Sequence, residues 1–394
     1  MGLFSGKEKE EIIAIFDIGS GSVGGALVKF SYTKDKITTP IIISQSRNEI
    51  KFRDGLDFTQ FVEDMDSALS KTAEDLYLQK KGAPNKIFCV LSSPWYISET
   101  KVINESKSEP FVVTSKKMND LIEKEKASLV KEYTDKYSGT NDMPVLIESI
   151  CMHSTLNGYI VHNPVGKTAK EININLYVSL SPKSSLDGIS KTLSKFFHHI
   201  PISYGTYMSS LYTTGIEKYM SVDTALLIAI GGEVTDIGIV SNGILTDTVS
   251  FPCGSNSLKR ILLESTKLSI SEISSSLALL SKDMLARGSY DVLLPGLKIA
   301  EEKWINSFKD SLLQLPQNTS LPGSVFMVSD ESVMSWFKNV IESEEGVSNI
   351  IARKNFSVVT ILGKDLLDIC KVKEGTCDQF LMVESIAYAL LKLR

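Results

Sequence analysis

Apolar runs alternate with a glycine-rich turn close to the N-terminus. Residues 12–16 form one apolar run, the segment Asp17-Ile18-Gly19-Ser20-Gly21-Ser22 follows, and residues 23–30 form a second run. Short apolar runs bounded by turn residues are typical of buried strands. The pattern predicts a β-hairpin whose turn lies at residues 17–22.

A second stretch, residues 224–257, has the same design. An apolar run at 225–230 leads into Gly231 and Gly232, and residues 237–240 and 244–250 predict two returning strands. Glycines at a hairpin tip leave backbone N–H groups exposed, and such groups can bind phosphate oxygens. The alternative interpretation is an ordinary β-meander with a glycine turn.

Other parts of the chain carry helical or strand periodicity. Apolar residues at helical spacing predict helices at residues 57–80, 184–197, 202–217, 258–263, 272–280, 294–315, 331–341 and 380–393. Short apolar runs predict strands at residues 38–44, 87–91, 325–328 and 358–362.

The pattern of apolar and polar residues changes in residues 104–183. Short strands are predicted at 110–113, 145–152 and 172–180, and Thr114 is placed to cap a helix between the first two. The segment reads as a small α+β module inserted into the first domain.

Composition and charge narrow the class of protein. The chain has 394 residues, 43% of them hydrophobic and 23% charged, which fits a globular protein of two or more domains. The net charge of −5 gives no basic field for nucleic acid. The five cysteines are scattered without CxxC spacing, so a cytoplasmic location is expected rather than a zinc site or disulfide framework. No apolar run is long enough to span a membrane.

Two strand–glycine turn–strand units, each opening one half of a chain, resemble the plan of the actin-like ATPase superfamily. FDIGSGSVGGALV resembles its first phosphate loop and AIGGEVTDIGIVSNGIL its second. The resemblance implies a duplicated, ribonuclease H-like α/β fold in which two domains clamp ATP and magnesium. The implied parts are a first actin-like domain (11–103 and 184–222), an inserted small domain (104–183), a second actin-like domain (223–255 and 320–394) and a helical lid (256–319).

The same resemblance assigns candidate site residues. Asp17 and Asp236 fall on the catalytic-type positions, and Asp17 is expected to face the magnesium ion. The positions expected to hold the nucleotide are Gly19, Ser20, Gly21, Ser22, Gly231, Gly232, Thr235, Ser329 and Asp330. An Asp at position 17 that only caps a turn is the alternative.

Three departures from the superfamily pattern weaken the expected chemistry. The second phosphate loop normally opens with an Asp, and this chain has Ala229 there. The adenosine turn at Ser329-Asp330 has no glycine, and residues 271–280 lack the Lys expected beside the adenine. We therefore expect weak ATP binding, weak or lost hydrolysis, or a fold used as a scaffold.

The inserted segment narrows the resemblance to one branch. ESICMHSTLNGYIVHNPVGKTAKEININLYVSL, with its Asn163-Pro164-Val165-Gly166 element, resembles the inserted domain of FtsA, the bacterial division actin. The resemblance implies a polymerising cytoplasmic adaptor in cell division. It would associate with itself and reach the inner face of the membrane through membrane-linked partners.

Two alternatives remain open. A PilM-like component of type IV pilus assembly shares the fold, and its C-terminal helix ends in a tail that Leu391-Lys392-Leu393-Arg394 resembles. A small-molecule kinase of the same superfamily would need a carboxylate near the second loop, where Ala229 stands.

Overall fold

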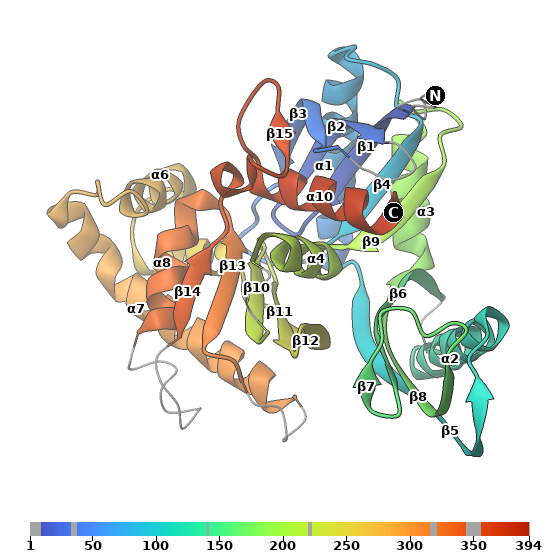
Figure 1. The fold of residues 1–394 in the computed structure, drawn as a ribbon. Coiled ribbons are helices and arrows are strands. Elements are labelled where there is room, and N and C mark those ends of the chain that lie inside the picture. The colour runs from blue at the N-terminus through green and yellow to red at the C-terminus, as the bar shows by residue number, and fades with distance from the viewer. Residues whose placement is uncertain are drawn as a thin grey trace.

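The computed structural model describes residues 9–32, 38–139, 142–219, 223–315, 321–343 and 356–393. These residues form two large β-sheets with helices on and between them, and a smaller module to one side (Figure 1). Among the described residues, no helix is both long and apolar enough to cross a membrane.

The first sheet has six strands and contains the N-terminal hairpin. Its order is β15 (Lys371–Val372), β3 (Ile41–Glu49), β2 (Ser22–Tyr32), β1 (Lys9–Ile18), β4 (Lys86–Leu91) and β9 (Ile202–Thr206). β1, β2 and β3 are antiparallel neighbours, and β4 and β9 continue the sheet in parallel with β1.

The second sheet repeats this arrangement with five strands. Its order is β12 (Ile244–Phe251), β11 (Thr235–Ser241), β10 (Ala225–Ile230), β13 (Ser324–Ser329) and β14 (Ser357–Thr360). An antiparallel meander again leads, and two strands parallel to its first strand follow. The sequence therefore builds one topology twice, as the paired hairpins predict.

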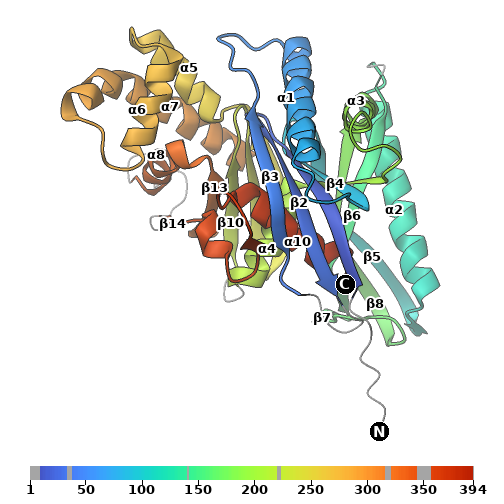
Figure 2. The ribbon, with the colours of Figure 1, turned by 90° about the horizontal axis from the view of Figure 1, so that it is seen from above.

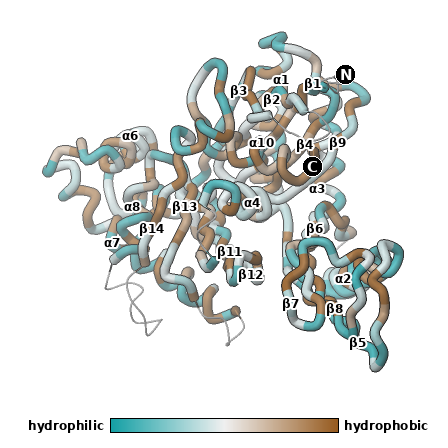
Figure 3. Tube along the Cα trace, viewed as in Figure 1, coloured by the Kyte–Doolittle hydropathy of each residue, from teal (hydrophilic) through white to brown (hydrophobic). Residues whose placement is uncertain are grey.

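Helices fill the space between the two sheets and cover their outer faces (Figure 2). α4 (Tyr207–Tyr219) and α10 (Gln379–Lys392) share one apolar core with strands of both sheets. α1 (Phe58–Leu78) and α3 (Lys183–Leu193) cover the far side of the first sheet. The far side of the second is covered by α5 (Ser255–Ser265), α6 (Ile270–Leu280), α7 (Arg287–Leu313) and α8 (Glu331–Glu342). α10 is coloured largely as hydrophobic in Figure 3, as a helix between two sheets requires.

α1 shows how local sequence signals produce one of these helices. Asp57 caps it by accepting a hydrogen bond from the backbone N–H of Gln60 at 2.9 Å. Apolar residues at helical spacing, among them Phe61, Met65 and Leu69, are buried against the sheet. The helix agrees with the one predicted over 57–80.

The inserted module is a four-stranded antiparallel sheet with one helix. The strands are β5 (Ile97–Val112), β8 (Thr168–Pro182), β6 (Pro144–Leu156) and β7 (Tyr159–Ile160), and the helix is α2 (Ser115–Lys136). β5 begins at Ile97, so residue 104, the expected start of the module, lies inside a strand. Hydrogen bonds join the module to the second sheet: Ser98 Oγ lies 2.9 Å from Thr248 Oγ1, and Thr100 Oγ1 donates to the Leu245 carbonyl.

One predicted element has a different structure. The helix expected over 202–217 begins only at Tyr207, because residues 202–206 form β9 at the edge of the first sheet. Gly205 explains the tight fit of this strand: a Cβ there would lie 2.6 Å from the Phe88 ring. Apolar periodicity alone did not separate the strand from the helix that follows it.

Candidate functional site

A cavity of about 350 Å³ lies where the two sheets meet. The turn between β1 and β2 and the turn between β10 and β11 both border it. Nine of the predicted site residues line it, namely Asp17, Gly19, Ser20, Gly21, Ser22, Gly231, Gly232, Asp236 and Asp330. The twofold hairpin pattern in the sequence thus places its two turns at one site.

The tips of the two hairpins touch each other directly. A Cβ built on Gly21 would lie 2.9 Å from the Cα of Gly232, and a Cβ on Gly232 would lie 2.7 Å from the Gly21 nitrogen. The Glu233 N–H donates to Ser20 Oγ at 3.0 Å, which ties the second turn to the first. In this structure the glycines serve the close approach of the two turns.

The second turn is also bound to the N-terminus of α5. The backbone N–H groups of Ser255 and Asn256 donate to the carbonyls of Gly231 and Gly232 at 2.9 and 2.8 Å. Helix N-terminal N–H groups are ready donors for phosphate. Here two of them are already used by the protein's own turn.

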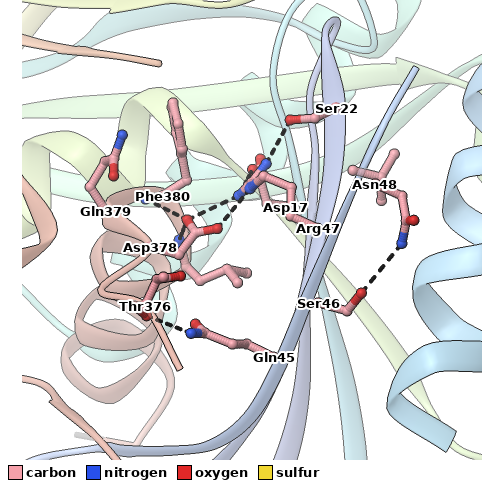
Figure 4. A network of polar contacts seen from close by, with 12 residues as sticks. Asp17, Ser22, Gln45, Ser46, Arg47, Asn48, Thr376, Asp378, Gln379 and Phe380 are labelled. Carbon is pink, nitrogen blue, oxygen red and sulfur yellow. Dashed lines mark hydrogen bonds and ion pairs between the residues drawn. The ribbon is translucent and has the colours of Figure 1, made fainter. Parts of the chain in front are cut away.

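Arg47 of β3 forms the centre of a charged network beside the first turn (Figure 4). Its Nη2 lies 2.7 Å from Asp17 Oδ2, and its Nε lies 2.7 Å from Asp378 Oδ2. Its Nη1 donates to Ser22 Oγ at 2.8 Å, and the Phe380 ring centre lies 5.0 Å from its Cζ. The sequence motifs gave no sign of Arg47 or Asp378, because neither residue lies in a phosphate-loop pattern.

Two further buried groups lie close to Asp17. Glu384 of α10 is fully buried, and neither of its carboxyl oxygens receives a hydrogen bond from the described residues. Burial, and then the charge of Asp17, raises the pKa of Glu384 well above its usual value. A raised pKa favours the protonated form of this carboxyl group. Tyr207 lines the cavity with a hydroxyl that is buried and unpaired among the described residues.

Asp236 joins the two halves of the molecule across the cleft. Its Oδ1 accepts a hydrogen bond from Ser93 Oγ at 2.5 Å, and its Oδ2 accepts one from the Ser93 N–H at 3.3 Å. Burial raises the pKa of Asp236 to about 6, and the two hydrogen bonds oppose this shift. A carboxyl group with this pKa can hold or release a proton near neutral pH.

Glu233 makes a second connection across the cleft. Arg260 of α5 donates two hydrogen bonds, of 2.8 and 2.7 Å, to the Glu233 carboxylate, and Asn256 donates a third at 2.8 Å. Arg260 Nε also donates to the Arg53 carbonyl, which lies beyond β3 in the first half. The contact fixes α5, the second turn and the first half to one another.

Two predicted site residues do not reach the cavity. The Thr235 hydroxyl donates to the Cys253 carbonyl at 2.7 Å and accepts from Trp304 Nε1, on the α7 side of the sheet. Ser329 is fully buried, with its hydroxyl bonded to the Asp330 carbonyl and its own carbonyl accepting from Gln379. Their positions in the strands turn both side chains away from the cleft.

The residues present do not fit a magnesium ion. The carboxylate of Asp17 is held by the Arg47 guanidinium, and Ala229, which lines the cavity beside Asp236, offers only a methyl group. Within the described part of the chain, no group of three or more His, Cys, Asp or Glu side chains is arranged to hold a metal. Magnesium needs several oxygen ligands that are free to turn towards it.

Comparison with solved structures supports the architecture. A PilM–PilN type IV pilus biogenesis complex matches with a TM-score of 0.59 at 13% identity, covering 98% of this chain and 97% of that one. An ethanolamine utilization protein EutJ from Carboxydothermus hydrogenoformans matches at 11% identity, with a TM-score of 0.39 and coverage of 96% and 89%. A Bacteroides thetaiotaomicron protein with an actin-like ATPase fold gives 8% identity, a TM-score of 0.39 and coverage of 94% and 95%. No protein-family model and no curated protein sequence matches the chain.

The duplicated topology and the full-length structural match agree with each other. The chain has an actin-like ATPase fold, as the paired hairpins predict. At 13% identity the match shows that the two chains share a fold.

Proposed function

We propose that the chain is a PilM-like scaffold protein, which lies at the inner face of the cytoplasmic membrane through a membrane-linked partner. The observation that carries the proposal is the match to a PilM–PilN complex over 98% of this chain and 97% of that one. The match includes the region of the inserted module, which distinguishes this plan from a bare pair of actin-like domains.

The cleft supports a scaffold better than an ATPase. The position of the second loop's carboxylate holds Ala229, and Asp17 is engaged by Arg47. The two turns that the sequence predicts to bind phosphates contact each other at their tips. The same observations speak against a small-molecule kinase, whose chemistry needs a free carboxylate near the transferred phosphate.

A division adaptor of the FtsA kind is the second candidate. Its support is the Asn163-Pro164-Val165-Gly166 element in the inserted module. Asn163 Oδ1 accepts from the Val165 N–H at 3.1 Å, and Gly166 adopts a positive φ of 85°, so the element forms a tight turn between β7 and β8. The turn belongs to the fold of the module and identifies no partner.

Deleting the gene in its native host separates the two candidates. A pilus scaffold predicts loss of surface pili and twitching with normal cell length, restored by the gene on a plasmid. A division adaptor predicts long, undivided cells. Normal pili together with normal division would contradict both candidates. A tagged chromosomal copy, crosslinked and purified from membranes, should bring down an inner-membrane protein of the pilus apparatus.

A further inference from the structure

We propose that Arg47 is a built-in cation of the cleft: its guanidinium takes the place of a metal ion, and protein contacts hold the cleft closed without magnesium or nucleotide. The inference concerns the cleft alone, and it holds or fails independently of whether the protein serves pili or division.

The guanidinium satisfies two carboxylates and a hydroxyl at once. Nε and Nη2 form a fork onto Asp378, at 2.7 and 3.1 Å, and Nη2 also reaches Asp17 at 2.7 Å. Nη1 donates to Ser22, the first residue after the hairpin turn. Paired planar contacts of this kind are the strong form of an arginine–carboxylate interaction.

The surrounding chain is shaped to hold this side chain. Gly24 of β2 lies beneath it, and a Cβ there would lie 2.8 Å from Arg47 Cζ. The Phe380 ring covers it at 5.0 Å. Asp378 is fixed in turn because its Oδ1 caps α10, accepting from the N–H groups of Phe380 and Leu381 at 3.1 and 3.2 Å. The cation therefore occupies a preformed niche made by β1, β2, β3 and the start of α10 (Figure 4).

Arg47 separates two carboxylates that would otherwise face each other across the niche. Arg47 pairs with Asp17, which is buried, and with Asp378, which is partly exposed, and the buried Glu384 lies near Asp17. Arg47 contacts the Asp17 and Asp378 carboxylates at the same time, at 2.7 Å each. A magnesium ion at Asp17 would have to displace a guanidinium that is held by three hydrogen bonds and an ion pair. Displacement would leave the partly buried Asp378 carboxylate without its partner, which is costly.

The two halves of the cleft are joined by contacts of the protein itself. Ser20 receives the Glu233 N–H, Ser93 donates to Asp236, and Arg260 reaches the Arg53 carbonyl. Each of these hydrogen bonds runs between the first and the second half. In a nucleotide-clamped protein the ligand supplies such bridging contacts, and here the side chains and turns supply them.

The first experiment uses the wild-type full-length protein. Its thermal unfolding midpoint is measured with 5 mM EDTA, with 10 mM Mg²⁺ or Mn²⁺, and with 1 mM ATP plus Mg²⁺. We expect shifts below about 1 °C, because a ligand stabilises only to the extent that it binds the folded state. A rise of several degrees with Mg²⁺ or with ATP and Mg²⁺, abolished by EDTA, would overturn the proposal.

The second experiment removes the built-in cation. Arg47→Ala leaves Asp17 and Asp378 facing a space the size of a guanidinium, so this variant should gain a weak divalent site. Its unfolding midpoint should fall, and 10 mM Mn²⁺ should raise it by roughly 1–2 °C if the metal is present at about ten times its Kd. Asp17→Asn combined with Arg47→Ala should lose this rescue.

Arg47→Lys provides the conservative comparison and guards against a variant that fails to fold. A lysine keeps the charge but loses the fork, so this variant should be less stable than wild type and still insensitive to Mn²⁺. The same Mn²⁺ dependence in wild type and in Arg47→Ala would show that the guanidinium does not occupy a metal position. Were Arg47→Ala to give no soluble protein, the wild-type and Arg47→Lys measurements would decide the question.

Discussion

At the scale of single residues, a methyl group at position 229 and a guanidinium at position 47 set what the cleft can do with ATP. We expect phosphate release by the wild-type protein to stay at background, because positioned charge carries most of the catalysis of phosphoryl transfer. Ala229→Asp should not restore activity, since Asp17 remains bound to Arg47 and the new, largely buried carboxylate would lie beside Asp236, its partner across β10 and β11. It should lower the free energy of unfolding by about 1–3 kcal/mol. A phosphate-release assay and urea unfolding test both points, and wild-type hydrolysis that disappears in Asp17→Ala would contradict the first.

Asp236 gives a residue-scale prediction about pH. Its pKa is raised from 3.8 to about 6 in the folded protein, so folding favours its protonated form. Its contribution to stability is complete below pH 3.8 and is lost as the pH rises through 6, a change of about 3 kcal/mol. Asp236→Asn removes this titration. The difference in unfolding free energy between wild type and variant, measured in urea from pH 4 to 8, should therefore move in favour of the variant as the pH rises. A difference that stays flat over that range would contradict the raised pKa.

At the scale of elements, much of the fold follows from local sequence, and the charged network does not. The two hairpins and α1 follow from short apolar runs, glycine turns and a capping Asp, all within about 20 residues of chain. Arg47, by contrast, meets a partner 331 positions away, and β3 shows only a polar alternation at that point. Asp378 looks like an ordinary helix cap, which it also is. Patterns in a single sequence describe residues that are close together along the chain. They therefore cannot predict a network that joins Arg47 of β3 to Asp378 at the start of α10.

The contact between the hairpin tips predicts the effect of one glycine substitution. Gly232→Ala would place a Cβ 2.7 Å from the Gly21 nitrogen and 2.8 Å from the Ser20 carbonyl, so the turns must separate. We expect a loss of about 1–3 kcal/mol in unfolding free energy and faster amide exchange at residues 19–22. Gly215→Ala in α4 is the matched control, since nothing lies within 4 Å of its added Cβ. The control should be neutral or stabilising by up to about 1 kcal/mol. Equal effects of the two substitutions would show that the tips are not in contact in solution.

At the scale of the whole molecule, the inserted module is bound to both halves. Glu148 of β6 accepts hydrogen bonds from Thr206 Oγ1 and Ser209 Oγ, at 2.9 and 2.8 Å, at the start of α4. On its other side, Ser98 and Thr100 reach β12. Deleting the module would therefore remove the buried hydrogen bonds of Glu148 as well as the module's exposed surface. Point substitutions on the exposed strand β7 test the role of that surface without removing these hydrogen bonds.

We predict that copies of the protein assemble head to tail. Joining one copy's surface to a different surface of the next gives a heterologous contact that does not close, and so produces filaments or short oligomers. The module presents an apolar pair for such a contact: Tyr159 and Ile160 of β7 are 79% and 61% exposed. Tyr159→Ser combined with Ile160→Ser should abolish assembly at high concentration or on lipid, with the unfolding midpoint unchanged. Sedimentation velocity and negative-stain microscopy measure the assembly, and Lys170→Ser, also in the module and exposed, is the control expected to assemble normally. If the wild-type protein stays monomeric under all of these conditions, the prediction is wrong. If the double variant still forms filaments, the contact does not involve β7.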